Sequence, residues 1–117
     1  MKLPMSVTLS KRATHHFRTI KIKTGVTNNV LARIAISLAI ESGEDVEKAP
    51  REDAAGQTLD RDLLFGELVY VYETVIREYM CEHEVSIPSN LAIASLIEIG
   101  AHKMGHVRSL DQLINLS

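Results

Sequence analysis

The chain has few of the residues that cross-link or bend small proteins. Its 117 residues include one cysteine, three prolines, six glycines and no tryptophan. The single cysteine, Cys81, excludes an intrachain disulfide and suits a reducing cytoplasm, and we expect it to be a buried or half-buried packing residue. Few prolines and glycines, with a hydrophobic fraction of 45%, favour one helical domain over 1–117 with few irregular stretches.

Several other signals are missing. Residues 1–10 contain no apolar core of a signal peptide, and no run approaches the roughly 18 apolar residues of a membrane-spanning helix. The phosphate-binding patterns GxGxxG and GxxxxGK[ST] are absent. The spacing of Cys81, His83, His102 and His106 matches no zinc pattern. The sequence therefore predicts no membrane partner, no metal, no cofactor and no enzymatic activity.

Charge is distributed unevenly, although the formal net charge is only −2. Residues 1–40 contain seven Lys or Arg and no acid, whereas residues 41–117 contain six Lys or Arg and all fifteen acids. A concentrated basic segment attracts a polyanion, and this one lacks the broad Trp, Phe and Leu face of a membrane anchor. We therefore expect a nucleic-acid partner, with the acidic part of the chain facing away from it.

A basic helix is expected near the N-terminus. Apolar and polar residues alternate over 5–10, which indicates a short strand or an extended arm, and Ser10 can cap a helix over 11–23. The apolar side of this helix should pack inward and comprises Ala13, Phe17 and Ile20. The other side carries an exposed ridge: Lys11, Thr14, Arg18 and Lys21. His15 and His16 flank the ridge and are expected to lie at the surface.

A tight turn should connect this helix to a second one over 28–42. Gly25 suits the left-handed position after a helix, and Thr27, Asn28 or Asn29 can cap the next one. Two helices and such a turn form a helix-turn-helix-like unit or an ordinary helical hairpin. The second helix is apolar on nearly all sides, so it must be buried nearly all round. Either other helices of the chain or a second copy could cover it; we favour a homo-oligomer, a dimer or tetramer.

The second half predicts further helices after an acidic connector over about 41–62. One continuous helix is expected over 62–81, with an acidic outer face. Another is expected over 91–104, capped by Ser89 or Asn90, and a capping box formed by Ser109 and Gln112 should start a last short helix. The predicted fold is mainly α: a compact bundle of about four to five helices with a helix-turn-helix or ribbon-helix-helix-like N-terminal half.

The predicted DNA-contacting residues lie on the first helix, the turn and the second helix. They are Lys11, Arg12, Arg18, Lys21, Lys23, Thr24, Gly25, Asn28 and Arg33. Cations would contact phosphates, and the free amides that open the second helix would add a phosphate site. The role of Arg33 stays open, because its stripe with Ser37 and Glu41 fits an internal ion pair equally well. The ridge has few Asn or Gln to pair with base edges, which favours backbone binding.

Three segments carry a family resemblance. The sequence KTGVTNNVLARIAISLAIESG, with FRTIK before it, resembles the signature of the DndE family of DNA sulfur-modification (phosphorothioation) proteins, and GQTLDRDLLFGE and IEIGAHKMGHVRSLDQL agree with that family in order and spacing. The chain departs from the pattern at Asn28, where proline is expected, and at Ala32, where cysteine is expected, so neither of these can be essential to a family function. The resemblance implies a small helical oligomer that binds double-stranded DNA, with a preference for nicked duplex. It also implies that the protein works beside other DNA sulfur-modification proteins, the sulfur-transfer and ATPase components.

Three hypotheses follow. The first is a non-enzymatic DNA-binding subunit of the sulfur-modification machinery, which explains the polarised charge. The second is a transcriptional regulator of ribbon-helix-helix or helix-turn-helix type, which would read base edges. The third is an enzyme with a carboxylase-like activity, against which the missing nucleotide-binding motifs argue.

Overall fold

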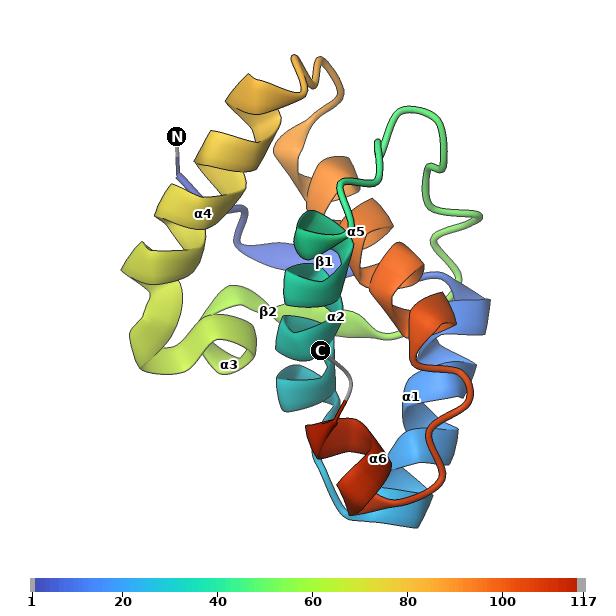
Figure 1. The fold of residues 1–117 in the computed structure, drawn as a ribbon. Helices are drawn as coiled ribbons and strands as arrows, with labels where there is room; N and C mark the ends of the chain where they lie inside the picture. The colour runs from blue at the N-terminus through green and yellow to red at the C-terminus, as the bar shows by residue number, and fades with distance from the viewer. Residues whose placement is uncertain (1, 116–117) are drawn as a thin grey trace.

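The computed structural model describes residues 2–115. It is mainly helical with one small sheet (Figure 1), which confirms the predicted fold class. The elements are β1 (Ser6–Thr8), α1 (Lys11–Thr24), α2 (Asn28–Glu41), β2 (Thr58–Asp60), α3 (Arg61–Phe65), η1 (Gly66–Leu68), α4 (Val69–Glu82), α5 (Ser89–Lys103) and α6 (Leu110–Ile114).

Helix α1 forms as its local sequence predicts. The Ser10 hydroxyl caps it by accepting a hydrogen bond of 3.0 Å from the amide of Ala13. The three residues of the predicted inward face, Ala13, Phe17 and Ile20, are all buried. Gly25 ends the helix at φ 77° and donates its amide to the carbonyl of Lys21. At this φ an L side chain is strained, so glycine is favoured.

The residues before α1 form a strand whose partner lies in the predicted connector. Strand β1 pairs antiparallel with β2 (Figure 1), and Val7 lies opposite Leu59 in the register. The expectation that residues 41–62 form an unstructured connector is therefore wrong at its C-terminal end. Strand β2 has only three residues, of which Leu59 alone is buried, so its alternation is too short for a sequence pattern to detect.

The rest of the connector lacks helix and strand but is anchored by side chains. The Tyr79 hydroxyl donates to the carbonyl of Glu44 and accepts from the amide of Val46. Arg51 donates its guanidinium to the carbonyl of Thr8 over 2.7 Å and its amide to the hydroxyl of Ser95 over 2.8 Å. These bonds fix the path of the connector over the helices.

Helices α2 and α5 form the centre of the core. Five residues of α2 are fully buried: Leu31, Ala32, Ala35, Ile36 and Ala39. Gly100 of α5 lies directly against α2, because a Cβ added there would stand 2.1 Å from the carbonyl oxygen of Ala35. Thus α5 of the same chain covers one side of α2. On its other side Val30, Ile34 and Leu38 stay only half-buried.

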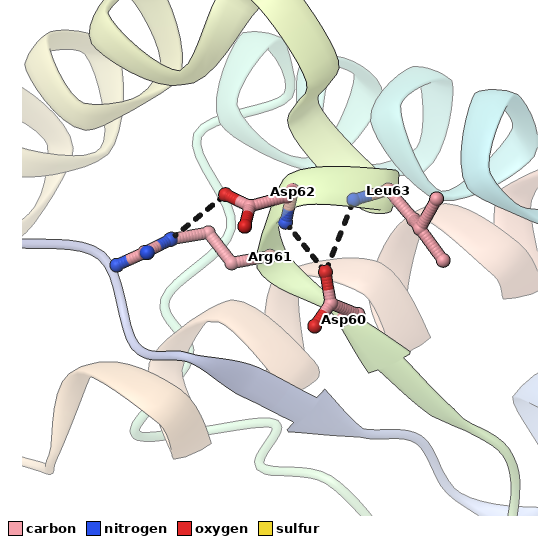
Figure 2. A network of polar contacts seen from close by, with 4 residues as sticks. All are labelled: Asp60, Arg61, Asp62 and Leu63. Atoms are coloured by element: carbon pink, nitrogen blue, oxygen red, sulfur yellow. Dashed lines mark hydrogen bonds and ion pairs between the residues drawn. The ribbon is translucent and has the colours of Figure 1, made fainter.

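The predicted continuous helix over 62–81 is wrong. Gly66 adopts φ 53° and ψ −130°, which ends α3 and starts the one-turn helix η1 before α4. Figure 2 shows the start of α3, where the Asp60 carboxylate accepts from the amides of Asp62 at 2.9 Å and Leu63 at 3.3 Å. Apolar spacing continues across Gly66, so it does not reveal the break.

Two features of the C-terminal region differ from the expectation and one agrees. Pro88 precedes α5 as its cap residue, and within residues 2–115 no side chain caps that helix, so neither Ser89 nor Asn90 does. Cys81 is exposed, because it lies on the outer side of α4. The Ser109 half of the capping box forms, since the Ser109 hydroxyl accepts from the amide of Gln112; the Gln112 side chain accepts from the amide of Arg108, one residue before the cap.

Candidate nucleic-acid interface

An open groove of about 920 Å³ runs between the exposed side of α1 and the connector. Helices α1 and α2 supply one wall, and residues 52–57 supply the other. The lining residues are Lys11, Arg12, Thr14, His15, Arg18, Lys21, Asn28, Glu52, Asp53, Ala55, Gly56 and Gln57.

The connector wall is held tightly against the start of α1. Leu9 and Gln57 share a hydrogen bond of 2.8 Å between backbone atoms, and the amide of Gln57 donates to the Thr14 hydroxyl over 2.9 Å. A Cβ added at Gly56 would stand 2.2 Å from the carbonyl oxygen of Ser10, so only glycine fits this approach. The groove therefore has a fixed shape on this side.

Two acids of the connector, Glu52 and Asp53, line the same groove as cations of the predicted DNA-contacting set, although the connector was expected to face away from DNA. One Asp53 oxygen accepts from the amides of Ala55 at 2.9 Å and Lys11 at 3.0 Å, and these bonds lower the pKa of Asp53 below its ordinary value. The first turn of α1 contains no acidic residue. Its free amides and the positive end of the helix dipole therefore attract this carboxylate from the connector.

Four cations of the predicted set come together in this groove: Lys11, Arg12, Arg18 and Lys21. All four are exposed, and none forms an ion pair within the described part of the chain. They outnumber the two carboxylates of the groove, those of Glu52 and Asp53. Unpaired cations gathered in one groove suit the backbone of a polyanion.

Asn28 also lines the groove and is joined to the opposite wall. Its amide nitrogen donates to the side-chain oxygen of Gln57 over 2.6 Å, while its own Oδ1 is buried and has no partner among residues 2–115. Gln57 and His15 line the groove although neither was in the predicted set. Gln57 stands in the segment GQTLDRDLLFGE that carries the family resemblance, which was the only signal for it.

Three further predicted residues form the corner between α1 and α2 rather than the groove. The Thr24 hydroxyl donates to the carbonyl of Ile20 and accepts from the amide of Val26, so this side chain helps to end α1. Gly25 forms the left-handed turn, and Lys23 is exposed beside it. The Thr27 side chain caps no amide of α2 within the described residues, so the first amides of α2 remain available to an anion.

Arg33 lies apart from the rest of the predicted set. Its guanidinium donates to the carbonyl of Leu64 over 3.2 Å and lines a separate depression of about 320 Å³ with Ile34 and Tyr72. The ion pair with Glu41 that the stripe also allowed is not formed in the part of the chain that the structure describes. The bond to Leu64 gives Arg33 a role in joining α2 to α3.

A smaller cavity of about 260 Å³ lies behind α1, between α5 and the connector. His16 lines it and is half-buried, which differs from the expected surface position. Burial first, and then the charge of Arg12, lowers the pKa of His16 below the ordinary 6.5. Glu98 accepts from the amide of Glu52 at 2.9 Å rather than pairing with His102.

Two observations concern metals and membranes. No group of three or more His, Cys, Asp or Glu side chains within residues 2–115 is arranged to hold a metal ion. Among the helices that the structure describes, none is both long and apolar enough to cross a bilayer.

Comparisons with known proteins agree on one family. The family model described as "DNA sulphur modification protein DndE" matches residues 6–104. The crystal structure of DndE from Escherichia coli B7A, involved in DNA phosphorothioation modification, is 25% identical, with a TM-score of 0.68 over 86% of this chain and 96% of that one. The crystal structure of a DndE G21/24K mutant is 23% identical, with the same TM-score and coverage. No curated protein matches the chain.

Proposed function

Because the chain belongs to the DndE family of DNA sulphur modification proteins, we propose that it serves DNA phosphorothioation as a DNA-binding subunit without enzymatic activity of its own. One observation carries this proposal: Lys11, Arg12, Arg18 and Lys21 line one open groove along α1 and form no ion pair within the described residues. Cations held in a row without partners match the regular charges of a duplex backbone.

The dimensions of α1 suit this role. Lys11 and Lys21 are ten residues apart, which spans about 15 Å of helix. Phosphates of one DNA strand follow one another every 3.4 Å or so along the duplex axis, so this length faces about four of them. The groove offers four cations in that span. Binding through phosphates fixes the register of a protein on DNA but carries no sequence information.

We further propose that the protein acts as a homo-oligomer, a dimer or tetramer, in the cytoplasm, together with other proteins of the sulfur-modification pathway. Val30, Ile34 and Leu38 of α2 remain half-buried along one stripe, and a second copy would complete their burial. Each subunit would then add its own row of cations. A nicked duplex bends at lower cost than an intact one, so it would reach the rows of several subunits more easily.

The structure does not favour the alternative function, a transcriptional regulator of ribbon-helix-helix type. Such a reader would insert a β-ribbon into the major groove. Here β1 is already paired with β2 of the same chain, and its central residue Val7 is buried against the core. Strand β1 is therefore not presented as a free ribbon to the base edges of a duplex.

The decisive experiment compares two charge-matched double variants. Arg18→Gln with Lys21→Gln removes two groove cations, whereas Lys48→Gln with Arg77→Gln removes two exposed cations from elsewhere. Fluorescence anisotropy would follow binding to intact, nicked and sequence-randomised duplexes between about 50 and about 200 mM salt.

The groove variant should weaken binding to all duplexes alike and reduce the slope of log affinity against log salt by about 1.8, since each phosphate contributes about 0.9. The control variant should keep the parent slope. If both variants bind as the parent does, the groove is not the DNA site. Strong discrimination against the randomised duplex would instead favour the regulator.

A further inference from the structure

Helix α4 is much less covered than the other long helix of the second half. Of its 14 residues only Ile76 and Tyr79 are buried, whereas α5 buries eight of 15. The two helices are similar in length, so the difference comes from position: α5 lies in the core, while α4 lies at the side of the molecule (Figure 1). One whole side of α4 is therefore open to solvent.

Part of that open side is apolar. Nine large hydrophobic residues of the described chain are exposed, and five of them lie on α3, η1 and α4: Leu63, Leu68, Tyr70, Val71 and Val75. We call these five residues the α4 face. Leu68, Val71 and Val75 follow one another at spacings of three and four, which places them along one stripe of the helix. Tyr70 is 81% exposed beside that stripe, and Leu63 of α3 is 69% exposed.

Exposed apolar residues that follow one stripe of a helix are typical of a contact with a partner. Tyr residues in particular are enriched where proteins bind one another. Met5 is also exposed and is joined to the start of α3 through its backbone, since its carbonyl accepts a hydrogen bond of 2.9 Å from the amide of Arg61.

The charge around the α4 face is strongly negative. Residues 60–84 contain seven Asp or Glu and only two cations, Arg61 and Arg77. Arg61 is already paired with Asp62 at 3.4 Å. Glu67 and Glu78 are both exposed and stand on the side of the helix that carries Val71. The face therefore offers apolar side chains framed by carboxylates.

We infer that the α4 face docks a basic amphipathic helix of another protein, with apolar residues on the stripe and Lys or Arg beside the carboxylates. Charge excludes nucleic acid as the occupant, because phosphates would meet the acids. It also argues against a symmetric pair of α4 faces, in which Glu67 and Glu78 would oppose acids of the second copy.

The inference goes beyond the proposed function, because no residue of the groove takes part in it. Helices α1 and α4 lie on opposite sides of the molecule (Figure 1). A partner on α4 therefore leaves the basic groove open, so that both surfaces can be occupied at once.

The test uses the full chain and a synthetic amphipathic helix of about 18 residues made of Leu and Lys, long enough to fold on binding. Two control peptides have the same length: one carries Glu in place of Lys, and the other has its leucines scattered so that no apolar side forms. Amide shifts in NMR spectra of the labelled protein locate the contact, and a fluorescence titration gives the affinity.

The basic amphipathic peptide should shift amides of the α4 face, and both control peptides should bind at least about tenfold more weakly. Tyr70→Ser with Val71→Ser should lose about tenfold in affinity. The matched pair Ile22→Ser with Leu110→Ser, equally exposed elsewhere, should bind as the parent does. Glu67→Gln with Glu78→Gln, which keeps the apolar stripe, should weaken binding and reduce its salt dependence.

Three results would overturn the inference. The first is a contact that maps to Glu52 and Asp53 of the groove instead of α4. The second is equal binding by the parent and the Tyr70 and Val71 variant, with both folded by circular dichroism. The third is a fall in molecular mass of that variant in ultracentrifugation, because a second copy would then occupy the face.

Discussion

Replacing Gly100 by alanine should force apart the two helices at the centre of the core. The added Cβ would stand 2.1 Å from the carbonyl oxygen of Ala35 and 2.3 Å from its Cα. Non-bonded atoms attract one another best at about 3.5–4.0 Å. The obstacle is backbone, which cannot turn aside as a side chain can, so α5 must move away from α2 by more than about 1 Å.

The expected loss is about 2 kcal/mol in the free energy of unfolding. Overpacking a core typically costs about 1–3 kcal/mol, and a backbone obstacle places Gly100→Ala at the upper end of that range. The better helix propensity of alanine offsets about 1 kcal/mol of this loss. For a chain of this length each kcal/mol shifts the Tm by about 4 °C, so the Tm should fall by about 8 °C.

Urea unfolding and thermal melts followed by circular dichroism would measure the loss. The companion variant Ala35→Gly tests the cause, because the obstructing atoms belong to the Ala35 backbone and remain after the methyl group is removed. The double variant should therefore be less stable than either single one, although losses at two touching positions need not add. Parent-like stability of Gly100→Ala, or its rescue by Ala35→Gly, would refute this account of the α2 and α5 contact.

Three further outcomes are expected. Gly25→Ala should lower stability by about 1 kcal/mol in thermal melts, because alanine is strained at the left-handed φ of 77°. No clash adds to this loss, since the added Cβ meets no atom within 4 Å. Arg33→Met should lower stability by about 1 kcal/mol in urea through the lost bond to Leu64, while anisotropy shows unchanged duplex affinity. His16→Gln should make the stability of the fold less sensitive to acid. The pKa of His16 is lowered in the folded state, so its contribution to stability is fully present above pH 6.5 and is lost as the pH falls from there through the lowered pKa. Urea unfolding at about pH 7.5 and about pH 5 would show the smaller decline in the variant.

The features that sequence could predict depend on neighbouring residues. Ser10, Gly25 and Ser109 each stand at a helix end that they cap or turn, and each acts through a residue at most four positions away. The inward side of α1 follows in the same way from a spacing of three and four. Such signals are contained in a short window, so a single sequence is sufficient to read them.

The features that sequence missed depend on contacts between distant parts of the chain. Strand β2 exists because β1 pairs with it from 50 to 54 residues away, and three residues are too few to establish a periodic pattern. Asp53 entered the groove because its carboxylate bonds the amide of Lys11, 42 residues earlier. Gly66 interrupts the predicted helix, although the apolar spacing continues across it. A glycine within an apolar pattern can adopt either a negative or a positive φ, and the sequence does not show which.

Placing α1 and α4 on opposite sides gives the molecule a permanent electric dipole that the net charge of −2 does not reveal. In the field of a polyanion this dipole experiences a torque, which turns the α1 side inward before any atom touches. Rotational alignment of this kind shortens the search for a productive encounter and is weakened as salt shortens the reach of the field. The uneven distribution of charge along the sequence thus acts first on how fast, and in which orientation, the protein meets a charged surface.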